Sequence, residues 1–210
     1  TDLLAEQPSL TVISGAADKT VKQVTSDSRA VQAGGLFFAL KGHQTDGHNY
    51  IKEAIANGAT VIVTDGRTVK TADHICVLVS AQSKADYASL CSKIYPNRPE
   101  ILTAVTGTNG KTSVCEYLRQ IWSKATWPSA AIGTLGINSD IETPNKASAL
   151  LTTPPSEQLF ALLDNLRKGG VTHAAFEASS HGLDQMRLHK LPVNVAVFTN
   201  LSHDHLDWHG

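Results

Sequence analysis

The stretch ILTAVTGTNGKTSVCEYLRQI, residues 101–121, decides the fold of the second half of the chain. Its first five residues are a largely apolar run with the length of a buried strand. A turn with two glycines follows at 106–110, and Val114, Leu118 and Ile121 then recur at helical spacing. We therefore predict a strand, a tight loop and a helix in direct succession, which is the unit from which parallel α/β sheets are built.

The loop itself, TGTNGKTS at 106–113, carries the sharpest chemical signal in the chain. Glycines allow successive backbone N–H groups to point at phosphate oxygens, and the start of a helix adds its positive dipole end. Lys111 would then reach the terminal phosphates of a nucleotide, and the hydroxyl of Thr112 would bind Mg²⁺. The general phosphate-loop pattern has a glycine where this chain has Val105, so the loop is a shorter variant.

We prefer this interpretation to a glycine-rich turn whose lysine faces solvent. The predicted nucleotide-binding residues are Gly107, Thr108, Asn109, Gly110, Lys111, Thr112 and Ser113.

Outward from this loop, strand-like and helix-like segments alternate, which predicts the α/β fold class. Strands are expected at 35–40, 59–64, 74–79, 101–105, 130–137, 172–178 and 193–201. Helical apolar stripes run through 51–55, 87–94, 114–121 and 159–166. Ser83 and Asp86 have the spacing of a capping box ahead of the second stripe.

A segment with two prolines and no periodicity, YPNRPE at 95–100, separates the two halves. We place a domain boundary there. It divides an N-terminal α/β domain at 1–98 from a phosphate-loop domain with a parallel sheet at 99–210. Because the chain stops at Gly210 directly after a polar motif, we expect the second domain to be incomplete.

The composition of the chain argues against two classes of binding partner, nucleic acids and membranes. The 210 residues carry a formal net charge of −1, so no bulk attraction draws nucleic acid or an anionic membrane to the protein. No apolar run approaches the ~20 residues of a membrane span, and the first residues lack a signal-peptide pattern. The three scattered cysteines fit a reducing cytoplasm, and Cys115 is expected to be a small core residue.

A carboxylate is predicted at the ligand-binding edge of the sheet. Glu177 lies at the end of the strand expected at 172–178, and open α/β sheets bind ligands at the carboxyl ends of their strands. It suits a Mg²⁺ ligand, although a solvated loop charge is an equally good interpretation of this residue alone. Downstream, Gln185 and Arg187 offer an amide and a planar cation that is suited to carboxylate or phosphate.

A second polar cluster ends the chain. Residues 199–210, TNLSHDHLDWHG, hold three histidines and two aspartates, but their spacing matches no common zinc pattern. We favour a single histidine at a Mg²⁺–phosphate site, with His203 and His209 structural.

Three further clusters are weaker signals. Thr152 and Thr153 precede a helix, where they would serve either as anion ligands or as an ordinary N-cap. The clusters TSDSR (25–29) and KGHQTDG (41–47) are turns by local physics alone.

Taken together, these segments resemble the Mur ligase family. The resemblance is carried by TSDSR (25–29), GLFFALKGHQTDGHNYI (35–51), TGTNGKTS (106–113), LTTP (151–154), EASSHGLDQMR (177–187) and FTNLSHDHLDWHG (198–210). They occur in the family's order over nearly the whole chain. The two first-half segments are similar to those of members that act on a UDP-N-acetylmuramoyl-dipeptide.

The resemblance implies a site for each substrate. The uridine diphosphate would be held through Ser26, Ser28, His43, Gln44 and Thr45. A central ATPase domain would begin near residue 100, where the muramoyl-dipeptide would meet Thr152, Thr153, Ser179, Gln185 and Arg187. Metal positions match Thr112, Glu177 and His205, and the implied catalytic residues are Lys111, Glu177 and His205. Leu151 departs from the pattern, because some members carry Asn there.

The implied activity is ATP-dependent amide ligation in peptidoglycan precursor synthesis, by a cytoplasmic monomer that uses Mg²⁺ and a diamino acid. A substrate carboxylate would attack the γ-phosphate of ATP to give an acyl phosphate, and an amino group would then displace phosphate. The family pattern also has a carbamylated lysine and a third domain that receives the amino acid. We expect neither within these 210 residues, and therefore expect the chain alone to be inactive.

Two other functions fit the residues less fully. A folylpolyglutamate synthetase resembles the second half of the chain but would not need the clusters at 25–29 and 41–47. A non-catalytic module that binds a nucleotide or a UDP-sugar would need no more than the segments present. The choice between meso-diaminopimelate and L-lysine belongs to the amino-acid-binding domain, so these residues do not decide it.

Overall fold

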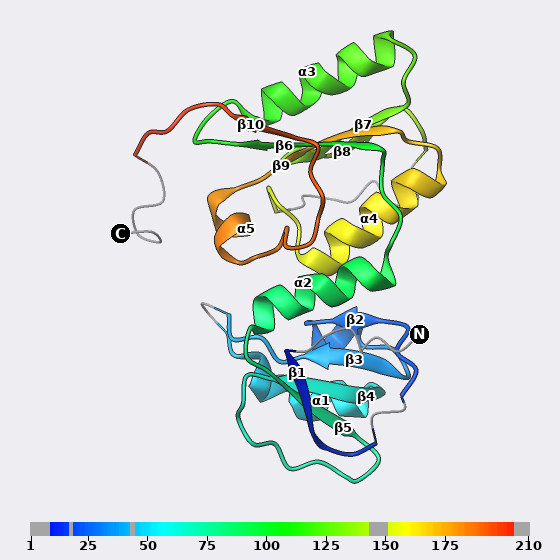
Figure 1. The fold of residues 1–210 in the computed structure, drawn as a ribbon, viewed down its shortest axis with the longest axis vertical. Coiled ribbons are helices and arrows are strands. Elements are labelled where there is room, and N and C mark those ends of the chain that lie inside the picture. The colour runs from blue at the N-terminus through cyan, green and yellow to red at the C-terminus, as the bar shows by residue number, and fades with distance from the viewer. Residues whose placement is uncertain (1–8, 17–18, 43–44, 143–150, 204–210) are drawn as a thin grey trace. The chain divides into compact units, whose positions relative to one another are not determined.

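The computed structural model describes residues 9–16, 19–42, 45–142 and 151–203. The chain divides into two compact units, Thr1–Ile94 and Tyr95–Gly210, and the division falls at the start of the proline-containing segment. Each unit contains its own five-stranded sheet with helices against it (Figure 1). Among the helices in the described ranges, none combines the length and the apolar character needed to cross a bilayer.

The first unit is built on a mixed sheet in the order β1-β5-β4-β3-β2. Its strands are β1 (Leu10–Ser14), β2 (Val24–Thr25), β3 (Gly35–Phe38), β4 (Ala59–Thr64) and β5 (Cys76–Ser80). Its helices are the 3-10 turns η1 (Ser28–Ala30) and η2 (Gly47–Tyr50), with α1 (Ile51–Ala56) and α2 (Ser83–Ile94). All neighbouring strands are parallel except β1, which is antiparallel to β5.

The three strands predicted in this unit are confirmed as β3, β4 and β5. Most of their residues are buried on both faces of the sheet, so their sequences are largely apolar. The sequence did not predict β1 and β2. Four of the five residues of β1 are exposed, and β2 is only two residues long, so neither produces an apolar run.

The capping box predicted at Ser83 and Asp86 is wrong. Asp86 is buried, and its two carboxylate oxygens accept hydrogen bonds from the hydroxyls of Ser9 (2.5 Å) and Ser80 (2.6 Å). The Ser83 hydroxyl donates instead to the Ser80 carbonyl. A buried carboxylate needs hydrogen-bond donors, and the strand end supplies them here in place of the helix backbone.

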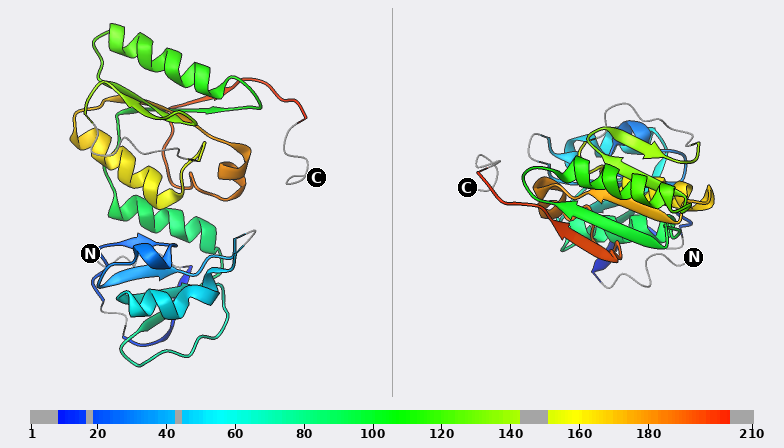
Figure 2. Two further views of the ribbon diagram at one scale, coloured as in Figure 1. Left: turned by 180° about the vertical axis from the view of Figure 1, so that it is seen from behind. Right: turned by 90° about the horizontal axis from the view of Figure 1, so that it is seen from above.

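The second unit has the strand order β10-β6-β9-β7-β8. Its strands are β6 (Ile101–Thr106), β7 (Ser129–Gly133), β8 (Gly136–Ser139), β9 (His173–Glu177) and β10 (Val195–Phe198). Its helices are α3 (Lys111–Lys124), α4 (Ser156–Lys168) and α5 (Ser180–Asp184). Only β8 is antiparallel to its neighbour, and α3 and α4 cover opposite faces of the sheet (Figures 1 and 2).

The predicted strand at 130–137 is a hairpin of two strands, β7 and β8. Gly133 pairs with Gly136 across a two-residue turn, and Gly136 has a φ of +85°, which favours glycine. The helical stripe at 114–121 is also corrected. Ile121 is exposed, whereas Trp122 is buried in the core of the unit.

The same core contains Cys115, as predicted. Burial is the main cause that raises the pKa of its thiol to about 12, and the charges of Glu177 and Glu116 act in the same direction. A thiol with that pKa is almost entirely protonated at neutral pH, so it is not a nucleophile.

Parallel pairing sets the position of the candidate site. Val105 of β6 pairs with Glu177 of β9, and Thr106 pairs with Phe198 of β10. The carboxyl ends of these strands therefore lie along one edge of the sheet, where open α/β sheets bind their ligands.

Candidate functional site

The phosphate loop, defined here as Thr106–Gly110, connects the end of β6 to the first residue of α3. Gly107 and Gly110 have φ values of +127° and +84°, in the region that residues other than glycine rarely adopt. Gly110 is the N-cap of α3 and has no side chain with which to cap it. The backbone N–H groups of the first turn of α3 therefore have no side-chain cap, an arrangement that suits an anion at the edge of the sheet.

Lys111 folds back over this loop. Its Nζ donates to the carbonyl oxygens of Gly107 (2.6 Å) and Thr108 (2.9 Å). The only cationic side chain of the predicted nucleotide-binding set therefore lies against the loop, within reach of any phosphate that the loop holds.

Glu177 lies beside the loop and is almost fully buried, at 2% exposure. Its Oε1 accepts hydrogen bonds from the Thr112 hydroxyl and from the Thr134 backbone N–H, both at 2.8 Å. The Thr134 hydroxyl donates to Oε2 at 3.3 Å. These three donors offset the cost of burying the carboxylate. The position also requires Gly133, because a Cβ there would lie 2.1 Å from Glu177 Oε1.

The donor set fits Mg²⁺. Thr112 and Glu177 supply a hydroxyl and a carboxylate oxygen at one point, and Mg²⁺ in phosphate-transfer sites takes one or two carboxylates and keeps several waters. Within the described ranges, no group of three or more His, Cys, Asp and Glu residues is placed to hold a metal, so they contain no closed zinc site. His205, the third predicted metal position, lies outside the described residues.

The residues predicted to meet the dipeptide lie next to Glu177. The hydroxyl of Thr153 donates to the Glu177 carbonyl (2.7 Å) and accepts from the Ser179 backbone N–H (2.8 Å). The hydroxyls of Thr152 and Thr134 are 3.1 Å apart. Ser179 is the N-cap of α5, where its hydroxyl accepts from the Gly182 N–H.

Arg187 extends this cluster. Its Nε and Nη2 donate to Oε1 of Gln185 (3.1 and 2.7 Å), and its Nη1 donates to the Thr153 carbonyl. Burial lowers the pKa of the guanidinium from its ordinary value, against the opposing effect of Glu157. Arginine stays charged at neutral pH even so, which leaves a fixed cation close to the end of β9.

In the first unit, Ser28 has a defined setting. It is buried, and its hydroxyl donates to Glu53 Oε2 (2.6 Å) while the Asn57 amide donates to its carbonyl (2.9 Å). Ser26 is half-buried and Thr45 is exposed. His43 and Gln44 lie outside the described residues.

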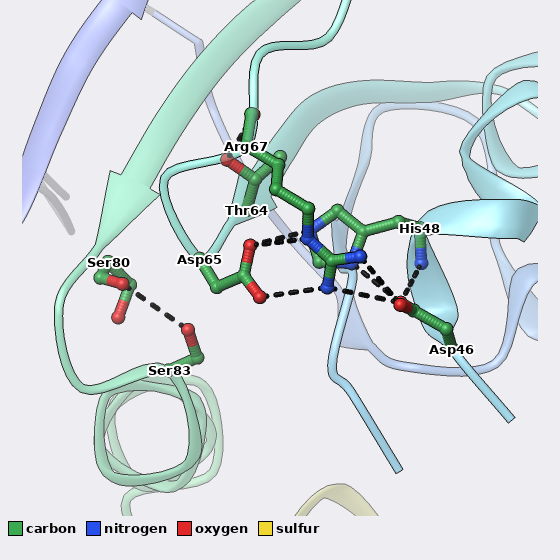
Figure 3. Close-up of polar contacts among 7 residues, drawn as sticks. All are labelled: Asp46, His48, Thr64, Asp65, Arg67, Ser80 and Ser83. Atoms are coloured by element: carbon green, nitrogen blue, oxygen red, sulfur yellow. Dashed lines mark hydrogen bonds and ion pairs between the residues drawn. The ribbon is translucent and has the colours of Figure 1, made fainter. Parts of the chain in front are cut away.

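Asp46 and His48, which follow β3 in the chain, belong to a charge cluster that the sequence did not predict (Figure 3). Arg67 donates to Asp46 (2.6 Å) and to Asp65 (2.8 Å), and His48 lies between the same two carboxylates. The Arg67 guanidinium is the main cause that lowers the pKa of Asp65 to about 2, and it also lowers the pKa of Asp46. No local pattern connects Arg67 with Asp46, because 21 residues separate them.

Sequence reasoning also missed Thr134, which has two contacts with Glu177. Its position in the turn between β7 and β8 was hidden because that hairpin was predicted as one strand.

A glycine-rich loop between a strand and a helix, with a buried carboxylate at the end of the neighbouring strand of the sheet, gives the second unit the architecture of a phosphate-loop α/β domain. A family model described as the Mur ligase middle domain matches residues 105–210, and one described as the Mur ligase family catalytic domain matches residues 20–105. The chain belongs to the Mur ligase family.

Individual relatives agree with this assignment. A UDP-N-acetylmuramoyl-L-alanyl-D-glutamate--2,6-diaminopimelate ligase of Brucella melitensis is 43% identical over 92% of this chain and 39% of its own length. The protein of that name from Bradyrhizobium diazoefficiens is 44% identical over 90% of this chain and 38% of its own length.

Two solved structures of ligases are also similar to this chain. A structure of a ligase with that name is 32% identical, with a TM-score of 0.72, over 90% of this chain and 38% of the other. The MurF ligase of Thermotoga maritima, solved in complex with ADP, is 25% identical, with a TM-score of 0.55, over 87% of this chain and 38% of the other. The chain thus spans about two fifths of the length of these relatives.

Proposed function

We propose that the chain is part of an ATP-dependent ligase that joins 2,6-diaminopimelate to UDP-N-acetylmuramoyl-L-alanyl-D-glutamate. The observation that carries this proposal is the hydrogen bond between Thr112 and Glu177. It joins the phosphate loop and its helix to the cluster of hydroxyls around Thr153, so that a nucleotide and an acceptor carboxylate would meet there. The identity of 43–44% to ligases of that name supports the choice of substrates.

In the proposed site, ATP occupies the loop and the start of α3, at Gly107 to Ser113. Lys111 would exchange its two loop carbonyls for phosphate oxygens, which are stronger acceptors for an ammonium group. Thr112 and Glu177 would hold Mg²⁺, together with His205. The metal would neutralise charge on the phosphate oxygens. The similar MurF ligase was solved in complex with ADP, which supports the choice of an adenine nucleotide as a ligand.

The neighbouring cluster of polar side chains would bind the dipeptide. The planar guanidinium of Arg187 is suited to pair with a carboxylate, and its hydrogen bonds to Gln185 fix its orientation. Thr152, Thr153 and Ser179 offer hydroxyls beside it. These groups would place the D-glutamyl side-chain carboxylate in line with the γ-phosphorus of ATP, and positioning of this kind accounts for much of the rate in phosphoryl transfer.

Two steps then follow. The carboxylate oxygen attacks the γ-phosphorus and the bond to the β-phosphate oxygen breaks, giving an acyl phosphate and ADP. An amino group of diaminopimelate next attacks the acyl carbon, phosphate leaves, and the ammonium loses a proton to give the amide. Residues outside this chain would receive the amino acid.

The first unit is proposed to hold the uridine diphosphate through Ser26, Ser28, His43, Gln44 and Thr45. Its support is the match of residues 20–105 to the family model and the hydrogen-bonded setting of Ser28. We further propose a monomer that works in the cytoplasm, where nucleotide-linked precursors and ATP are available.

The direct test uses the complete protein with ATP, Mg²⁺, diaminopimelate and the UDP-muramoyl-dipeptide. We expect ADP, phosphate and the UDP-muramoyl-tripeptide in equal amounts. Two controls replace diaminopimelate by lysine, and the UDP-muramoyl-dipeptide by a folate with glutamate as the incoming amino acid. Turnover with the folate pair, or no turnover with the UDP substrate, would overturn the proposal.

A further inference from the structure

The segment that follows β10, Thr199–Ser202, is bonded along its length to the phosphate loop. The backbone N–H of Thr108 donates to the Asn200 carbonyl at 3.0 Å. The N–H of Ser202 donates to the Thr108 hydroxyl at 3.0 Å. Among the residues that sequence analysis assigned to the site, neither Thr199 nor Asn200 received a role.

Asn200 pairs with both backbone groups of Asn109. Its Oδ1 accepts from the Asn109 N–H at 3.1 Å, and its Nδ2 donates to the Asn109 carbonyl at 3.1 Å. The Thr199 hydroxyl donates to the same carbonyl at 2.7 Å. Together these bonds fix the two peptide planes on either side of Asn109, in the middle of the loop.

The close approach of the two segments depends on Gly107. A Cβ at that position would lie 2.2 Å from the Thr199 hydroxyl and 2.8 Å from the Asn200 carbonyl oxygen. Gly107 also has a φ of +127°, so the loop needs glycine there for two separate reasons. A glycine-rich loop of this kind has many conformations when it is not held, and ordering it on binding costs affinity.

We propose that Thr199 and Asn200 are positioning residues that hold the phosphate loop in the shape that accepts ATP. Neither residue is assigned a contact with the nucleotide. Both act through the backbone of Asn109, which lies two residues before the first residue of α3. This inference rests on the proposed function, since it takes ATP as the ligand of the loop.

The test compares variants of the complete protein. Thr199→Val removes the hydroxyl with little change of shape, and Thr199→Ser keeps the hydroxyl. Asn200→Ala removes both side-chain bonds to Asn109. The measurements are kcat, the KM for ATP and the KM for the UDP substrate. Amide hydrogen exchange at Asn109 adds a readout that does not depend on turnover.

We expect Asn200→Ala to raise the KM for ATP roughly tenfold or more, since two hydrogen bonds are lost. The KM for the UDP substrate should stay within twofold, and the Asn109 amide should exchange faster. Thr199→Val should raise the KM for ATP less, and Thr199→Ser should recover most of that loss. If Asn200→Ala does not fold, the Val and Ser pair at Thr199 decides the question.

The inference is overturned if the wild-type protein turns over and both variants keep the wild-type KM for ATP. It is also overturned if the KM values for both substrates rise together, because that result indicates a general loss of structure. If the wild-type protein itself shows no ATP-dependent turnover, the proposed function fails instead, and the two failures are thereby distinguished.

Discussion

The hydroxyl of Thr112 donates a 2.8 Å hydrogen bond to Oε1 of Glu177, and so joins the first turn of α3 to the end of β9. The two residues are 65 positions apart in the chain. The contact places a buried negative charge against a helix N-terminus, where the helix dipole stabilises it.

Substitution of Glu177 by Gln should abolish most of the turnover while the fold is kept. The amide retains an oxygen to accept the Thr134 N–H but loses the charge that would attract Mg²⁺. We expect kcat in the complete protein to fall by ~10²–10³ and the Mg²⁺ requirement to rise. Steady-state kinetics over a Mg²⁺ titration measures both. A variant with wild-type kcat would exclude Glu177 from the metal site.

Lys111→Ala should remove nucleotide-dependent chemistry and leave the melting temperature nearly unchanged. The side chain bonds only to carbonyls of its own loop in the described structure, so its loss should cost little folding free energy. Loss of one preorganised donor typically lowers the rate by ~10²–10³. Near-normal turnover would show that this loop does not hold the phosphates.

Gly133→Ala should destabilise the second unit through Glu177 alone. All three nearest atoms to the added Cβ belong to the Glu177 side chain, so the side chain must move. Overpacking of this kind costs about 1–3 kcal/mol in free energy of unfolding. In a Glu177→Ala background the same change should cost almost nothing. Denaturant unfolding of the four proteins of this cycle tests the coupling, and additive costs would contradict it.

The charge cluster around Arg67 should make the first unit sensitive to acid. The folded pKa of Asp65 is about 2, below the unfolded value of ~3.9, so the stabilisation is present above pH ~4 and is lost as the pH falls toward 2. The lowered pKa of Asp46 acts in the same direction. The difference in melting temperature between wild type and Arg67→Gln should shrink below pH ~4 and at high salt, because these side chains are partly exposed to solvent. A difference that grows on acidification would refute the assignment.

Ser28→Ala combined with His43→Ala should affect the UDP substrate and not ATP. Ser28 lies in the first unit, where its hydroxyl bonds to Glu53, whereas the phosphate loop lies in the second. We expect a higher KM for the UDP substrate and an unchanged KM for ATP. Glu53→Gln is the matched control, since it keeps an acceptor for Ser28 and changes only the charge. The reverse pattern of KM values would overturn the assignment of the first unit.

The sequence predictions were most accurate for the elements whose residues are buried. Strands β4 and β6 were predicted closely because each is a short, largely apolar run whose residues are buried or half-buried. Helix α4 was predicted from its leucine stripe and from the glycines that follow it. By contrast, β1 and α5 were missed, because an exposed edge strand and a five-residue helix leave no periodic pattern.

By itself, the sequence determined the features that depend on neighbouring residues. Gly107 and Gly110 specify a turn with positive φ, and Lys111 begins the helix after it. The predicted roles of these residues stay predictions. Only the tertiary structure decided which distant groups complete the site. Parallel pairing of β6 with β9 and β10 brings Glu177 and Asn200 to the loop, and strand register is a property of the whole sheet. No local sequence pattern encodes this strand register. The hydrogen bonds that complete the site join residues 65 and 91 positions apart in the chain, and they form only when the sheet has folded.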